Sequence, residues 1–199
     1  MQKEVKKSWA LFLGIGTMMI AHGLQMQIMG IRSVLEQFSI FTTGIFMSGY
    51  YVGYFIGSKT TPNLVQKVGH IRVFAAFASL ASLSALVAVA YVNPLMWTIS
   101  RFITGISLVS CYVVAESWLN DRATNKNRGQ LLSAYMMVIY FGLAVGMLLL
   151  NVSEPKAYEP FILVSVLLSL ALVPILLIKR PAPKFKKIGT ISIKELFNI

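Results

Sequence analysis

Residues 73–91 read VFAAFASLASLSALVAVAY, a run without a charged side chain. A helix needs about 20 apolar residues to cross the hydrocarbon core of a bilayer, and this run is close to that length. Strands of a membrane barrel alternate apolar residues with polar ones that face the lumen, whereas this run is apolar on every side. The stretch therefore predicts a transmembrane helix.

The same pattern recurs on both sides of this stretch. The apolar runs that qualify as spans are Trp9–Met29, Ile40–Ser58, Val73–Tyr91, Met96–Leu119, Leu131–Asn151 and Phe161–Ile178. Breaks are predicted at Arg32 with Glu36, Lys59 to Pro62, Asn93-Pro94, Asn120 to Asn127, Glu154-Pro155 and Lys179-Arg180-Pro181. The first run follows a basic start but is too long for a signal peptide and lacks a small-x-small cleavage site. We therefore expect an all-α membrane protein with six transmembrane helices.

The composition agrees with a chain whose main partner is the lipid bilayer. Hydrophobic residues make up 56% of the chain, charged residues 13%, and the mean hydropathy is +0.70. Soluble domains carry about 25% charged residues, so a domain of this size has too little interior to bury the apolar surface. The net charge of +11 lies in short clusters between apolar runs rather than along one face, which argues against nucleic-acid binding.

The Lys and Arg residues predict the orientation of the helices. One side collects Lys3, Lys6, Lys7, Lys59, Lys67, Arg72, Arg122, Lys126, Arg128, Lys179, Arg180, Lys184, Lys186, Lys187 and Lys194, whereas the other has Arg32, Lys156 and Arg101. Cytoplasmic loops are enriched in Lys and Arg, so both termini are expected in the cytoplasm. The organisation is then a cytoplasmic N-terminus (1–8), a six-helix domain (9–178) and a basic cytoplasmic linker (179–199).

Motifs for catalysis, metals or cofactors are absent from the sequence. Cys111 is the single cysteine, so the chain has no disulfide framework and no cysteine-based metal site. The single aspartate, Asp121, lies in an expected loop, and the sequence contains no Ser-His-Asp set, HExxH or Walker motif. We expect no enzyme activity, no metal and no cofactor.

Small residues recur at the spacing of helix-packing motifs. Gly49, Gly53 and Gly57 form a double GxxxG run in the second span, and Gly142 and Gly146 form another in the fifth. Close backbone contact supplies much of the association between helices in lipid. Two interpretations stay open: static packing, and a surface on which two parts of a moving protein slide. No repeat between the first and last three spans is visible in the sequence.

Two ionisable residues lie in the fourth span. A charged side chain costs roughly 2.5–3.5 kcal/mol at a helix centre on insertion scales. Arg101 and Glu116 are about 22 Å apart on a straight helix, so they cannot pair, but together with Gly105 and Tyr112 they fall within about 60° of one stripe. Arg101 is either functional or an interfacial snorkelling side chain. Glu116 is either a proton carrier or a structural partner of Arg72, Arg122 or Arg128.

A polar stripe also runs through the first span. Met18, His22, Gln25 and Met29 follow helical spacing on one face. Such a stripe lines either a cavity or another helix. An unperturbed imidazole titrates near neutral pH, so His22 is a candidate for binding or relaying a proton, and an interhelical hydrogen bond is the alternative.

Three segments carry a resemblance to the amino-terminal half of a major facilitator superfamily transporter. Residues 67–72 (KVGHIR) resemble the end of the family's basic, Gly-containing loop after the second span, and residues 101–105 (RFITG) match its Arg-x-x-x-Gly signature in the fourth. Residues 116–120 (ESWLN), with Arg128-Gly129 and the Gly142–Gly146 pair, resemble an uncharacterised bacterial branch. Two positions depart from the family's loop: Pro62 stands where Gly is usual, and Gln66 where an acidic residue is usual.

The resemblance implies twelve spans in two six-helix halves, with a small solute bound between them near the midplane. This chain is expected to supply the amino-terminal half, either as a fragment, which we favour, or as a half-size protein that pairs with a second copy. His22, Gln25, Arg101 and Tyr112 are then candidates for the transport cavity or for coupling. Glu116 and a cytoplasmic gating loop of Gln66, Lys67, Gly69 and Arg72 would control the cytoplasmic side, and the glycines at 49, 53, 57, 105, 142 and 146 would pack the helices.

The expected function is secondary active transport of a small solute by alternating access, coupled to an ion gradient with the proton as the coupling ion. The expected location is the bacterial cytoplasmic membrane. The alternative is a six-helix membrane scaffold or assembly protein without transport.

Overall fold

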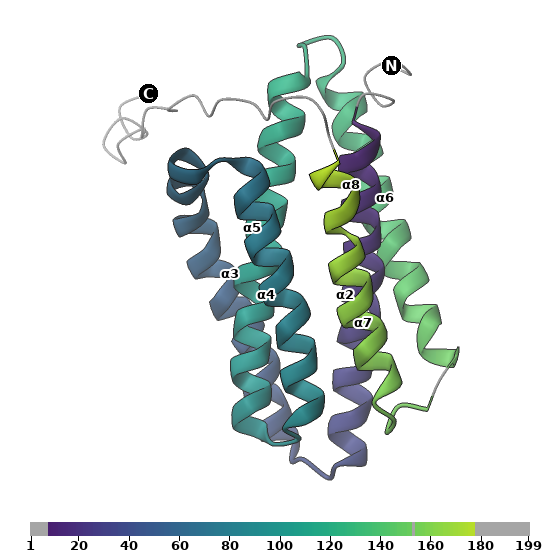
Figure 1. Ribbon diagram of the computed structural model, residues 1–199. Coiled ribbons are helices and arrows are strands. Elements are labelled where there is room, and N and C mark those ends of the chain that lie inside the picture. The colour runs from purple at the N-terminus through teal and green to yellow at the C-terminus, as the bar shows by residue number, and fades with distance from the viewer. Residues whose placement is uncertain (1–7, 153, 178–199) are drawn as a thin grey trace, which may run out of the picture.

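The computed structural model describes residues 8–152 and 154–177, and within them the chain is helical with no strand (Figure 1). The helices are α2 (Trp9–Leu35), α3 (Ile40–Val68), α4 (His70–Ala90), α5 (Pro94–Arg122), α6 (Arg128–Leu149), the short 3-10 turn η1 (Leu150–Val152), α7 (Glu159–Leu170) and α8 (Leu172–Leu176). The expected cytoplasmic N-terminus up to Lys7 and the basic linker from Lys179 lie outside the described residues.

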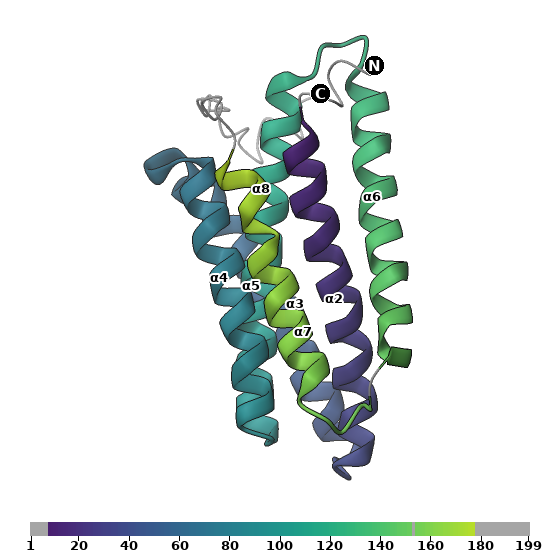
Figure 2. The same ribbon diagram turned by 45° about the vertical axis from the view of Figure 1, so that its right-hand side comes forward.

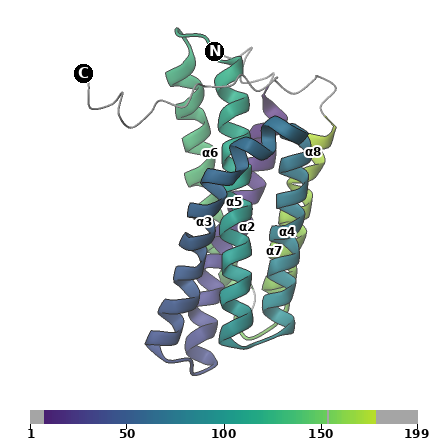
Figure 3. The same cartoon turned by 90° about the vertical axis from the view of Figure 1, so that its left-hand side faces the viewer.

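The long helices run roughly alongside one another and alternate in direction (Figures 1 and 3). As a result, the start of α2 and the end of α8 lie at the same end of the bundle, together with the α3–α4 and α5–α6 connections. The opposite end holds the connections after α2, α4 and α6. An even number of crossings has this outcome, and it gathers the described Lys and Arg clusters, Lys59 to Arg72 and Arg122 to Arg128, at one end. Which side of the membrane that end faces stays a prediction.

Among the described residues, five helical stretches are long and apolar enough to cross a membrane. They are Trp9–Leu35, His70–Ala90, Pro94–Arg122, Arg128–Leu149 and the α7–α8 stretch Glu159–Leu176. The sixth expected span corresponds to α3, which is long enough at 29 residues. Its glycines, threonines and tyrosines make it less apolar than the others. The structure therefore contains the six expected helical stretches, five of which have the composition of a lipid-spanning segment.

The break expected from Lys59 to Pro62 is wrong. Helix α3 continues through Pro62 to Val68, and only Gly69, at φ +89°, separates it from α4. The segment expected as a gating loop is therefore mostly helical: Gln66 and Lys67 belong to α3, and Arg72 belongs to the first turn of α4. The polar Lys-Thr-Thr-Pro sequence marks the end of the apolar run, whereas the helix itself continues past Pro62.

The last expected span is divided in two. Helix α7 ends at Leu170, and α8 begins at Leu172. Pro174 explains the interruption, because a proline lacks the N–H that would bond to the carbonyl of Leu170, and its ring crowds that carbonyl. Pro160, by contrast, lies in the first turn of α7, where the missing N–H has no intrahelical partner to lose.

Helix contacts divide the bundle into two groups of three. Helix α3 packs mainly on α5, and α4 also packs on α5; in the other group α6 and α7 both pack on α2. Figure 2 shows α6 standing beside α2, away from α3 and α4. The two groups meet chiefly where α4 packs on α7, since α2 and α5 barely touch each other.

The two groups repeat the same glycine contacts. A Cβ added at Gly105 would overlap the backbone carbonyl of Tyr50, and one at Gly23 would meet the carbonyl of Leu143 in the same way. The other contacts also occur in matching pairs: Gly49 with Thr98 and Gly142 with Gly16, then Gly53 with Phe102 and Gly146 with Ile20. Because α2 and α5 run in opposite directions, the six-helix unit is an inverted repeat, which the sequence did not show.

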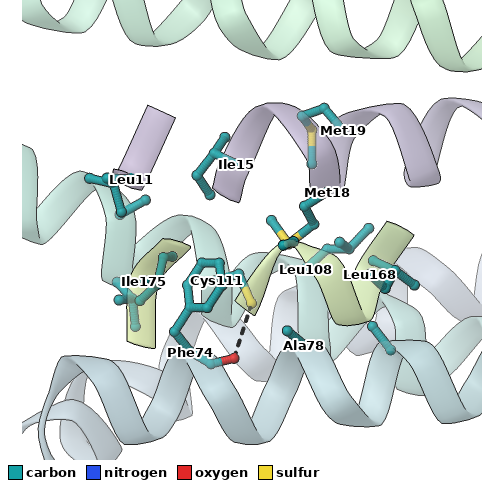
Figure 4. Packing of buried hydrophobic residues seen from close by; sticks show 14 of the residues in the cluster. Leu11, Ile15, Met18, Met19, Phe74, Ala78, Leu108, Cys111, Leu168 and Ile175 are labelled. Atoms are coloured by element: carbon teal, nitrogen blue, oxygen red, sulfur yellow. Dashed lines mark hydrogen bonds between the residues drawn. The ribbon is translucent and has the colours of Figure 1, made fainter. Parts of the chain in front are cut away.

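Cys111 lies in the core between the two groups. Its thiol is fully buried and approaches the carbonyl oxygen of Phe74 at 3.9 Å. Figure 4 shows it among apolar side chains from α2, α4, α5, α7 and α8, including Met18 and Leu168. Cys111 is therefore a core residue.

Candidate functional site

Arg101 is a buried cation with unsatisfied donors. It lies in the second turn of α5, and only 1% of it is exposed. Its Nε and Nη1 atoms have no hydrogen-bond partner among the described residues. The guanidinium carbon lies 4.7 Å from the centroid of the Tyr50 ring, a distance at which the ring face attracts a cation. Arg101 is therefore not a snorkelling side chain at the surface of this unit.

His22 lies against the same tyrosine from a different helix. Its imidazole, 5% exposed, stacks on the Tyr50 ring with centroids 5.4 Å apart and an interplanar angle of 19°. Its Nδ1 atom is also buried without a partner in the described part of the chain. Tyr50 of α3 thus brings side chains of α2 and α5 to one aromatic ring.

Glycines explain why Tyr50 can reach Arg101. Gly105 lies one turn after Arg101, and its missing side chain lets the backbone of Tyr50 contact α5 directly. On the other helix, Gly49 and Gly53 flank Tyr50 and make the same close approach. Tyr50 was not among the residues predicted from the sequence, although a tyrosine between two packing glycines is a signal that it faces the partner helix.

A line of aromatic rings leads from Arg101 toward the basic end of the bundle. The Tyr50 and Tyr54 rings are 6.0 Å apart, and the Tyr54 and Tyr112 rings 6.5 Å. The Tyr112 hydroxyl donates to the sulfur of Met19 at 3.0 Å. Tyr112 is therefore joined to Arg101 through two rings rather than by direct contact.

Glu116 lies beyond Tyr112 and is exposed. It lies within electrostatic range of Tyr54 and of Tyr135 of α6. Within the described residues no salt bridge of Glu116 is seen, so one of its two interpretations, a structural pair with Arg72, Arg122 or Arg128, finds no support there. The carboxylate therefore belongs to the far end of the aromatic line and not to the Arg101 site.

Gln25 belongs to a separate network of hydroxyl groups. Its amide Nε2 donates to Thr104 at a long 3.5 Å, and the Thr104 and Ser84 hydroxyls are 2.9 Å apart. Ser100 donates to the carbonyl of Ser84 at 2.8 Å. This network ties α2, α5 and α4 together, which is a structural task. Met18 and Met29 of the same stripe are fully buried in apolar clusters.

The segment expected to gate the cytoplasmic side lies at the basic end. Gln66, Lys67 and Arg72 are exposed there, around the Gly69 junction. The neighbouring His70 is buried, and its Nε2 lies 3.0 Å from the hydroxyl of Ser117 on α5. None of these side chains reaches the Arg101 site.

Arg32 provides a comparison within the same chain. It is 9% exposed, and it donates to the carboxylate of Glu36 at 3.2 Å and to the carbonyl of Ala157 at 3.2 Å. Its guanidinium also lies over the Phe161 ring at 5.5 Å. Arg32 shows how this fold satisfies an arginine that has a structural task, and Arg101 lacks each of these polar partners.

Known proteins resemble the chain over most of its length. The family model described as Major Facilitator Superfamily matches residues 11–196. An uncharacterized MFS-type transporter of Yersinia pestis (strain Pestoides F) is 31% identical over 141 residues, which cover 71% of this chain and 37% of that protein. The uncharacterized MFS-type transporter YcaD of Escherichia coli O45:K1 (strain S88 / ExPEC) is 34% identical over 119 residues, which cover 58% and 30%. The aligned residues thus span well under half the length of these relatives.

Proposed function

The chain belongs to the major facilitator superfamily, and from that premise we propose that it forms the amino-terminal half of a secondary active transporter that moves a small solute by alternating access. Its family and its apolar helices make it a multi-pass integral membrane protein. The second six-helix half is either a further part of the same polypeptide or a second copy of this chain. Because the relatives are bacterial, we place it in the bacterial cytoplasmic membrane.

The observation that carries this proposal is the buried guanidinium of Arg101, whose Nε and Nη1 have no hydrogen-bond partner among the described residues. A charge inside a membrane is costly, and such residues mark substrate or ion pathways. A protein that needed only packing at this position would favour an apolar side chain, which avoids the desolvation of a charge. His22, which shares the Tyr50 ring, adds an imidazole, a group that can take up and release a proton. The proton is therefore our choice of coupling ion.

The arrangement of the remaining candidates supports a moving protein. Glu116 and the exposed residues around Gly69 lie at the basic end, where a cytoplasmic gate would have to act. Where α3 meets α5 and α6 meets α2, glycines bring the backbones of the two helices into direct contact, without side chains between them. Such contacts are suited to small shifts between helices, and static packing is the alternative for them.

The experiment is a flux assay on the full-length gene product in proteoliposomes that enclose a pH-sensitive dye. A panel of small solutes is added outside, and a transported solute is recognised by the proton flux that it starts. We expect Arg101→Ala to abolish this flux while the protein still inserts, and Lys126→Ala, an exposed loop change, to leave it intact. Unchanged flux in Arg101→Ala would remove Arg101 from the mechanism.

A membrane scaffold without transport is the second candidate. It predicts that no solute starts a flux and that changes at Arg101 and Glu116 alter stability or the recovery of partner proteins. The same purified variants decide between the two, because only a transporter couples Arg101 to solute movement.

A further inference from the structure

We infer that Arg101 and His22 form a binding point for a carboxylate group and that the transported solute is a monocarboxylate. The inference rests on the proposed transport function, because it names the class of solute. It starts from two buried polar groups, Nε and Nη1 of Arg101 and Nδ1 of His22, that face one tyrosine ring and have no partner in the described residues.

None of the acidic residues that the structure describes balances the positive charge of Arg101. The acidic residues that the structure describes are Glu36, Glu116, Asp121, Glu154 and Glu159. Glu36 is paired with Arg32, and the others lie toward the ends of the bundle. Glu116, on the same helix as Arg101, is about 22 Å along the axis. A buried cation in low dielectric is stabilised by an opposite charge close by, and an anionic ligand would supply it at this position.

The anion carries a single charge. Arg101 is the one cation at the Tyr50 ring, and no lysine or other arginine of the described residues contacts that ring. A phosphate ester or a dicarboxylate would bring two negative charges to one guanidinium and leave one of them unbalanced. A monoanion leaves the occupied site neutral, which is the arrangement of lowest cost inside a membrane.

The shape of the donors favours a carboxylate over a spherical anion. A guanidinium is a planar set of N–H donors whose geometry matches the two oxygens of a carboxylate. The imidazole of His22, the other polar group on the Tyr50 ring, supplies a further donor when its proton is on Nδ1. The tyrosine rings of α3 offer an apolar surface for the rest of the solute, which the polar groups would hold by its carboxylate end.

Tyr50 controls access to this point. It is 8% exposed and covers Arg101 and His22, whereas its neighbour Tyr51, whose ring is 5.3 Å away, is 66% exposed. The site is therefore closed in this conformation, and a solute enters when Tyr50 moves off Arg101. The cation–π contact of 4.7 Å is then exchanged for a charge-assisted hydrogen bond to the ligand.

The test measures ligand-induced thermal stabilisation of the full-length protein in detergent. The probes are acetate, lactate and benzoate, each compared with its neutral amide, and sodium chloride at equal ionic strength. We expect at least one carboxylate to raise the Tm by about 2–4 °C, and its amide and chloride to have no such effect. Arg101→Gln should abolish the shift, whereas Arg128→Gln, which removes an exposed arginine, should keep it.

Several outcomes would overturn the inference. They are equal shifts by a carboxylate and its amide, an equal shift by chloride, a shift that survives in Arg101→Gln, or no shift by any of the three carboxylates. If Arg101→Gln does not purify as a folded protein, Arg101→Lys replaces it. That variant keeps the charge but loses the planar donor set, so we expect roughly tenfold weaker binding, and unchanged binding would overturn the inference.

The transport proposal can fail independently. A carboxylate that stabilises the wild type through Arg101 but starts no flux in proteoliposomes supports the anion site and refutes transport of that anion. A flux of neutral solutes without any carboxylate effect supports transport and refutes the anion site.

Discussion

Arg32 and Arg101, the two buried arginines among the described residues, have opposite surroundings. Arg32 donates to Glu36 and to Ala157, so removing it leaves a carboxylate and a carbonyl without their donor. Arg101 donates from Nε and Nη1 to none of the described residues, so removing it leaves no acceptor behind. A substitution of Arg32 should therefore lower the stability of the protein, whereas a substitution of Arg101 should affect its function.

We expect Arg32→Met to lower the free energy of unfolding by about 1.5–3 kcal/mol, because hydrogen bonds to charged groups are worth that much. Arg101→Met should leave it unchanged or raise it, because an uncompensated charge is replaced by an apolar side chain of similar length. Thermal unfolding of both variants in the same detergent measures the difference. A larger loss in Arg101→Met would mean that Arg101 has structural partners after all.

The sequence was enough to single out Arg101 and His22, because ionisable residues inside apolar runs are rare. It was not enough to bring them together. Their meeting point is Tyr50, one of several tyrosines in α3, and its importance comes from its position opposite Gly105. Gln25 lies on the same face of α2 as His22, but it bonds to Thr104 instead. Helix periodicity predicts which residues share a face, and only packing decides which neighbour each one meets.

At the scale of helices, the sequence predicted that each helix exists and in which order the helices follow one another. It did not predict the residues at which they end. Polarity marks where a span leaves the hydrocarbon, whereas a helix ends where its backbone hydrogen bonds end. Helices α3 and α5, each with 29 residues, are about 44 Å long at 1.5 Å per residue. The hydrocarbon core is about 30 Å thick. Lys59 to Val68 and Asn120 to Arg122 thus continue as helix beyond the apolar runs.

Glycines of one helix should respond differently according to what they face. At Gly53 of α3, a Cβ would overlap the carbonyl of Phe102, whereas at Gly44 of the same helix it would meet nothing within 4 Å. Gly53→Ala should therefore cost about 1–3 kcal/mol through overpacking, and Gly44→Ala should be neutral or stabilising by about 0.5–1 kcal/mol through helix propensity. Chemical or thermal unfolding of the two variants gives the comparison, and equal effects would contradict close packing of α3 on α5.

Gly69 should be sensitive for a different reason. Its φ of +89° and ψ of 161° lie in a region that only glycine adopts readily, although a Cβ there would meet no neighbouring atom. Gly69→Ala is expected to cost about 1–3 kcal/mol of backbone strain. The exposed Gly129, which also has open space but no positive φ, is the control, and we expect little effect of Gly129→Ala.

At the scale of the whole molecule, the alternating helices place the basic connections at one end. The positive-inside bias then predicts that Lys67 and Lys126 face the cytoplasm and Lys156 the opposite side. Cys111 is fully buried, so the wild-type chain is a suitable background for single cysteine substitutions.

We expect a membrane-impermeant maleimide to label Lys156→Cys on intact cells and to label Lys67→Cys and Lys126→Cys only after the membrane is opened. All three positions are exposed, so a difference in labelling reports the side of the membrane. Labelling of Lys126→Cys, and not of Lys156→Cys, on intact cells would reverse the orientation.

The main partner of α2 is α6, which is synthesised much later. Ribosomes add ~5–20 residues per second, so on the order of 5–20 s separate the synthesis of Leu35 from that of Arg128. During this interval α3, α4 and α5 can assemble, because each packs on another of the three. Helix α2, with Gly23 and its polar His22, waits in the insertion machinery or in lipid without its partner. Among the described helices α2 to α5, the one that carries His22 is thus expected to be the last to gain its main partner.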